Sequence, residues 1–71
     1  MREAWVIENP EGKFFSGIKN AQARGERTWV DLPDARLYRD KMLATKTLYV
    51  MDLDLVQAQV TKVVAVNRRG E

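Results

Sequence analysis

The feature that most constrains this chain is the absence of both cysteine and histidine from its 71 residues. Without cysteine no disulfide can form, and without either residue a structural zinc site lacks its ordinary ligands. A domain of this size buries only roughly 60% of the surface of its unfolded chain. Small domains therefore commonly need a disulfide, a structural metal or self-association to be stable. We therefore expect one domain, residues 1–71, that is held together by packing alone or by formation of a homo-oligomer.

The N-terminal segment contains no targeting signal that we can identify. The residues Met1-Arg2-Glu3-Ala4-Trp5 are not followed by an apolar stretch of signal-peptide length, and no apolar run is long enough to cross a bilayer. The lack of cysteine also fits a reducing compartment. These observations predict a cytoplasmic protein with no membrane partner.

The charge of the chain is nearly balanced, with twelve basic and ten acidic residues and a net charge of +2. Residues 1–12 carry one basic and three acidic residues, residues 13–36 carry five and three, and residues 37–71 carry six and four. The net charges of these segments are therefore −2, +2 and +2. This distribution indicates a mildly asymmetric surface rather than a nucleic-acid-binding tail.

The first part of the sequence predicts a β-hairpin. Residues 4–8 are aromatic and β-branched, as expected of a strand, with Trp5 and Ile7 on one face and Val6 on the other. The segment Asn9-Pro10-Glu11-Gly12 predicts a turn, because proline presets φ early in a turn and glycine tolerates a positive φ. Residues 13–16 then form the return strand.

A polar segment and a short third strand follow the hairpin. Residues 17–27 are punctuated by Gly17 and Gly25 and predict a loop, whose mobility the sequence leaves open. The segment Thr28-Trp29-Val30 predicts a strand.

The region from residue 31 to residue 55 allows two interpretations. Asp31-Leu32-Pro33-Asp34 resembles a helix start, so one helix could span residues 33–51. Alternatively, a single turn at 32–36 precedes a separate helix capped by Asp40, which we favour because aspartate is a good N-cap. An apolar helical stripe with one charged interruption lies mostly after Asp40, and Asp52-Leu53-Asp54 ends the helix. The stripe consists of Leu37, Lys41, Ala44, Leu48, Met51 and Leu55.

Residues 56–66 form the clearest predicted strand. Alternation puts Val56, Ala58, Val60, Val64 and Val66 on one face with Lys62 as the exception, and Gln57, Gln59, Thr61 and Asn67 on the other. The simplest arrangement of all these elements is an α+β fold, with an antiparallel sheet of three to five strands and one main helix packed on one face.

The sequence excludes the usual catalytic and metal-binding arrangements. Ser16 is the single serine and has no histidine to activate it, and its pairing with Lys13 or Lys19 is speculative. Asp52 and Asp54 are closely spaced carboxylates, but a calcium loop needs more ligands and usually a glycine. We therefore predict a protein that is not an enzyme and has no catalytic residues, no cofactor and no metal.

Two neighbouring aromatic residues are the most informative candidates for binding. Phe14 and Phe15 follow each other on a predicted strand and therefore point to opposite faces, so at least one of them is expected at the surface or at an interface. One interpretation is that the helix covers one ring and the loop or another subunit covers the other. The alternative is a binding hot spot. Basic residues nearby could add an aromatic and basic surface of the kind that binds single-stranded nucleic acid, namely Lys13, Lys19, Arg24 and Arg27.

The order of these segments resembles small accessory proteins encoded by bacteriophages and prophages. The resemblance rests on residues 5–17 (WVIENPEGKFFSG), 29–32 (WVDL) and 35–38 (ARLY), which match a hairpin, a tryptophan strand and an "A-R-hydrophobic-aromatic" segment. A helix and a valine-rich last strand follow in that group. The motifs are structural, so the resemblance transfers no binding residue. It implies production inside an infected bacterium and action by binding, in some members by inhibiting host machinery or defence systems.

These observations lead to one preferred function and two alternatives. We expect a non-enzymatic phage-type accessory protein that acts by binding a host or phage protein in the cytoplasm of a bacterial host cell. The first alternative is a small nucleic-acid-binding protein that uses the basic and aromatic region 13–27. The second is a structural or assembly protein of a phage.

Overall fold

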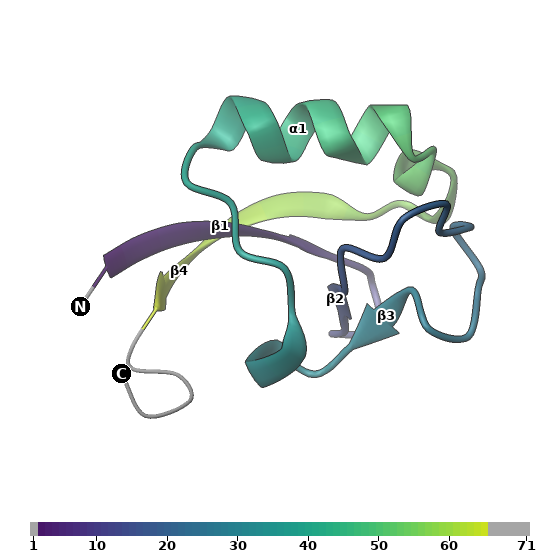
Figure 1. Cartoon of the computed structure of the whole chain (residues 1–71), viewed down its shortest axis with the longest axis horizontal. Coiled ribbons are helices and arrows are strands. Elements are labelled where there is room, and N and C mark those ends of the chain that lie inside the picture. The colour runs from purple at the N-terminus through teal and green to yellow at the C-terminus, as the bar shows by residue number, and fades with distance from the viewer. Residues whose placement is uncertain (1, 66–71) are drawn as a thin grey trace.

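The chain folds into a four-stranded antiparallel sheet with one main helix on one face (Figure 1), as predicted. The computed structural model describes residues 2–65 of the chain. The strands lie in the order β3-β2-β1-β4, so β1 is flanked by β2 and β4. In chain order the elements are β1 (Arg2–Glu8), β2 (Phe14–Phe15), β3 (Trp29–Val30), the 3-10 turn η1 (Leu32–Asp34), α1 (Lys41–Val50), the 3-10 turn η2 (Leu53–Val56) and β4 (Gln59–Ala65).

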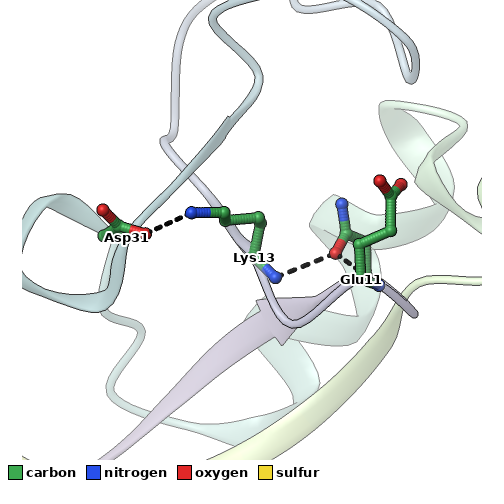
Figure 2. A network of polar contacts seen from close by, with 4 residues as sticks. Glu11, Lys13 and Asp31 are labelled. Carbon is green, nitrogen blue, oxygen red and sulfur yellow. Dashed lines mark hydrogen bonds and ion pairs between the residues drawn. The ribbon is translucent and has the colours of Figure 1, made fainter.

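The predicted hairpin is present, and a buried asparagine organises its turn. The backbone N–H of Asn9 donates to the carbonyl of Lys13, and the N–H of Gly12 donates back to the carbonyl of Asn9. Gly12 has a φ of 81°, which is the left-handed conformation that a three-residue hairpin loop requires. The Asn9 side-chain oxygen accepts hydrogen bonds from the N–H groups of Glu11 and Lys13 (Figure 2). This turn sets the register in which Glu8 faces Phe14.

The pairing of β1 with β4 is the longest in the sheet, and it puts Ile7 opposite Val60 and Trp5 opposite Lys62. Trp5 and Ile7 share the helix-covered face, while Val6 points to the other face, as predicted. Val6 is nevertheless fully buried, and the η1 segment lies on that side of the sheet (Figure 1).

The last strand differs from its prediction in where it begins and in the exposure of Val64. It begins at Gln59 rather than at residue 56, because Gln57 adopts a left-handed conformation and Val56 belongs to η2. Val64 was expected to be covered but is 58% exposed, since it pairs with Glu3 at the end of the sheet that α1 does not cover (Figure 1). The predictions for Val66 and Asn67 lie outside the described residues.

Hydrogen bonds hold the loop between β2 and β3 in a defined conformation. The Thr28 hydroxyl donates to the carbonyl of Gln22, and the Trp29 indole donates to the carbonyl of Ala23. Ser16 donates its backbone N–H to Thr28 and its hydroxyl to the carbonyl of Arg27. The loop therefore packs as part of the domain.

The connection from β3 to the helix follows the second of the two interpretations. A short turn over Leu32–Asp34 is separated from α1, and the Asp40 carboxylate caps α1 by accepting from the N–H of Leu43 at 2.8 Å. Between these elements, Tyr38 exchanges two backbone hydrogen bonds with Trp5. This bridge was not predicted, and it fastens the connection to the edge of β1 opposite β4.

The core lies between α1 and the sheet. Ala44 and Leu48 are the buried residues of α1, and Met51 packs against the core, so this part of the predicted stripe is correct. Leu55 does not belong to it: Asp52 adopts a left-handed conformation that ends the helix, and Leu55 is 64% exposed on η2. The buried core residues are Ile7, Phe15, Tyr38, Ala44, Leu48, Leu53 and Ala58.

Candidate protein-interaction surface

The two phenylalanines of β2 point to opposite faces, as predicted from strand geometry. Phe15 is only 2% exposed and packs edge to face against Trp29, with ring centroids 6.2 Å apart. Phe14 is half-buried on the other face of the sheet. Phe15 is therefore a core residue, and of the two only Phe14 offers any surface to a partner.

The basic residues predicted near the hairpin do not surround an exposed aromatic ring. The Lys13 ammonium forms an ion pair with Asp31 across the β2–β3 side of the sheet (Figure 2), in an exposed position where such pairs stabilise little. Lys19, Arg24 and Arg27 are exposed on the loop that follows β2. Because Phe15 is buried, this region presents charge without the exposed aromatic platform that single-strand binders use.

Four of the eight exposed large apolar residues in the described part of the chain lie instead on α1. A surface helix normally turns its large apolar residues toward the core. Here the core takes only Ala44 and Leu48, and the outer side of α1 is left open to solvent. Four large apolar residues are exposed there, namely Met42, Leu43, Tyr49 and Val50.

The exposed residues of α1 form two rows that flank Lys46. Successive residues of an α-helix are rotated by about 100°, so residues seven apart lie in nearly the same direction. Met42 and Tyr49 therefore form one row, and Leu43 and Val50 form the other. Lys46 projects between the two rows, on the side of the helix opposite the core.

Contacts of α1 with the sheet show which way each row faces. Thr47, on the side of the Leu43–Val50 row, interacts with Tyr38, which is bonded to the edge of β1 opposite β4. The other row, Met42 and Tyr49, therefore lies on the β4 side. The ammonium of Lys41 sits 5.7 Å from the centre of the Trp5 ring, and Lys62 of β4 lies near the same ring.

Electrostatic contacts around the helix are local. Lys62 of β4 also lies near the Trp5 ring, at 5.9 Å from its centre, and forms an ion pair with Glu3. Lys46 has no ion-pair partner among the residues that the structure describes. Its charge therefore stands alone between two apolar rows.

The phenol of Tyr38 is the group whose titration the fold alters. Desolvation by burial raises the pKa of Tyr38 above its ordinary value of 10.0, and a hydrogen bond with the Thr47 side chain and the positive charge of Arg36 oppose this rise. The guanidinium of Arg36 lies 6.0 Å from the centre of the Tyr38 ring. Neutral Tyr38 thus belongs to the core beneath α1.

The exposed rows of α1 were not predicted, although the sequence carries a signal for them. The predicted stripe accounts for one side of the helix, and the large apolar residues at positions 42, 43, 49 and 50 fall outside that stripe. Apolar residues in excess of what one face can bury indicate a second contact surface.

Other kinds of site find no support in the described part of the chain. No three acidic side chains gather where they could hold a metal ion within residues 2–65. In the same range, no helix has the length and apolar character needed to span a membrane. No protein-family model, curated protein or solved structure matches this chain.

Proposed function

We propose that this protein is a non-enzymatic binding module that docks the Leu43–Val50 row of α1 into an apolar groove of another protein. This proposal rests on one observation. Large apolar side chains are exposed on the outer side of α1, which is the only α-helix among the described residues. Contiguous exposed apolar surface on a small domain typically marks an interaction site.

The spacing of this row suits a helix that lies in a groove. Leu43, Lys46 and Val50 occupy positions i, i+3 and i+7, which is the pattern of anchors in helix-in-groove recognition. Val50 is 67% exposed and Leu43 is 47% exposed, so both can lose further surface to a partner. Full burial of one such side chain contributes about 1.5–3 kcal/mol.

The charge at the centre of this surface defines the chemistry of the partner. Lys46 lies between the apolar rows and lacks an ion-pair partner in the described structure. A complementary groove is therefore apolar along its floor and carries a carboxylate at its rim.

The biological setting remains a prediction from the sequence. Action on a bacterial host protein, including a defence protein, rests on the resemblance to phage-encoded accessory proteins, as do the cytoplasmic location in an infected cell and the role in phage assembly. Nucleic-acid binding through residues 13–27 also remains a prediction, and the burial of Phe15 does not favour it.

Substitutions on α1 test the proposal. We expect Val50→Asp and Lys46→Glu each to abolish co-purification of a specific partner from bacterial lysate, because one puts a charge in the apolar groove and the other reverses the central charge. Leu55→Asp is the matched control, since Leu55 is exposed to a similar degree but lies on η2. All three positions are exposed, so the thermal unfolding of the variants should match that of the wild type.

The same experiment separates this surface from the hairpin. Retention of every partner by both Val50→Asp and Lys46→Glu would refute docking through this row. Loss of a partner in Phe14→Ala, combined with its retention by the two α1 variants, would assign binding to the hairpin instead.

A further inference from the structure

The strand β4 forms an edge of the described sheet, and its outer side has features of an interface. Its seven residues pair with β1 alone among the described strands. Exposed edges are normally protected by prolines, bulges or charged side chains. Here Gln59–Ala65 contains a single charge, on Lys62, and that ammonium is held by Glu3 above the helix-covered face.

The hydrogen-bonding pattern shows which groups of β4 point outward. Trp5 uses its backbone N–H and C=O to bond Tyr38, so its pair with Lys62 on the other side is of the type without hydrogen bonds. The pattern alternates along an antiparallel pair. The N–H and C=O groups of Val60, Lys62 and Val64 therefore point away from β1, toward the open edge.

The position of α1 specifies what can occupy this edge. The helix packs against both β1 and β4, so its axis lies over the region between these two strands. If a second copy continued the sheet through its own β4, the two helix axes would be separated by two strand spacings, about 10 Å. Helices pack against each other at about 8–10 Å.

We infer that this protein forms a homodimer in which the β4 strands of two copies pair antiparallel about a twofold axis. The two four-stranded sheets then become one sheet of eight strands, and the two α1 helices pack side by side on the same face. The Met42–Tyr49 row faces β4, so it is this row that enters the interface. Met42 is 83% exposed and Tyr49 is 60% exposed in the single copy, and both become covered.

Charge determines the register of the pairing. A twofold axis at Lys62 would place two ammonium groups directly opposite each other, which is unfavourable. An axis at Thr61 places Lys62 opposite the partner's Val60, and the outward N–H and C=O groups of these two residues then bond each other. Thr61 faces the partner's Thr61 in a pair of the type without hydrogen bonds.

This register also accounts for the exposed valine at the end of β4. With the axis at Thr61, the partner's Val64 lies level with Ala58. Ala58 belongs to the core cluster beneath α1 together with Leu48. Tyr49 follows Leu48 on the β4 side of the helix, so its ring covers the partner's Val64, which is otherwise open to solvent.

The dimer goes beyond the proposed function, because it uses the opposite flank of α1. The Leu43–Val50 row points away from β4 and stays accessible when two copies are joined. The two surfaces can therefore be tested separately.

Mass and cross-linking measurements test the dimer and its register. We expect the wild-type protein to have twice its chain mass of 8.2 kDa by sedimentation or light scattering. The chain has no cysteine, so a disulfide in Thr61→Cys can form only between copies. In a pair of this type the Cα atoms lie about 4.5 Å apart, within the range that a disulfide spans. Mild oxidation should therefore convert Thr61→Cys largely to the cross-linked dimer, and Glu11→Cys, at the exposed hairpin turn, should stay uncrosslinked.

Substitutions on α1 provide a second test of the dimer. We expect the double variant Met42→Glu/Tyr49→Glu to be a folded monomer, because both sites are exposed in one copy and four carboxylates would meet in the dimer. Val50→Asp is the control and should remain dimeric while losing the other protein partner. A monomeric wild-type protein, a dimeric double variant, or equal cross-linking of Thr61→Cys and Glu11→Cys would overturn the inference.

Discussion

Replacement of Asn9 by alanine is expected to destabilise the domain through its hairpin. The Asn9 side-chain oxygen accepts from the N–H groups of Glu11 and Lys13 at 3.0 and 2.9 Å, and Asn9 is buried. One intramolecular hydrogen bond contributes about 0.5–1.5 kcal/mol net, so loss of both lowers the free energy of unfolding by about 2 kcal/mol. For a domain of this size, that corresponds to a decrease in melting temperature of about 8–16 °C.

Chemical and thermal denaturation measure this loss. Asn9→Asp is the matched control, because a carboxylate can accept the same two hydrogen bonds, and Glu11→Ala removes a side chain while keeping the bonded N–H. Both controls should stay within about 0.5 kcal/mol of the wild type, as is usual for substitutions that break no specific feature. If Asn9→Ala also stayed within that range, the side chain would not organise the turn and the reasoning would be refuted.

Two further predictions concern backbone conformation and pH. Gly12 and Gly17 both have a φ of 81°, but a Cβ at Gly12 meets no atom within 4 Å, whereas one at Gly17 would lie 2.9 Å from the Cβ of Arg36. Gly12→Ala should therefore cost about 1–2 kcal/mol from backbone strain alone, and Gly17→Ala should cost more in the same denaturation assay. Burial raises the pKa of Tyr38, so the folded state holds this proton more tightly than the unfolded state. Its contribution to stability should be complete below pH 10.0 and should be lost as the pH rises through the folded-state pKa, and this loss should be absent in Tyr38→Phe.

Local signals in the sequence were sufficient to predict most elements of the fold. The turn at residues 9–12, the tryptophan strand and the Asp40 cap each depend on residues close in sequence, and all three are present. The bridge between Trp5 and Tyr38 joins residues far apart in sequence, and no local pattern encodes it.

The errors share a physical cause, which is that periodicity does not show where an element stops. Leu55 continues the helical stripe in sequence, but the left-handed conformation of Asp52 removes it from the helix. Val64 continues the strand alternation, but the helix does not extend over it. In both cases the spacing was regular, but the helix ended before it reached the residue concerned.

The candidate site was only partly predictable. Strand geometry correctly separated Phe14 from Phe15, but it could not show which ring the core would take. The exposed rows of α1 depend on how much of the helix the small sheet can cover, and that is a property of the folded domain.

The position of β1 between β2 and β4 has a consequence for synthesis of the protein. Residues 2–8 are translated before the other strands of the sheet, yet their longest pairing is with residues 59–65, which follow more than fifty residues later. Until those residues emerge, the nascent chain carries an unpaired valine and isoleucine strand that cannot complete its sheet. The sheet is therefore expected to form only after residues 59–65 have been translated, and chaperones can bind the growing chain during this interval.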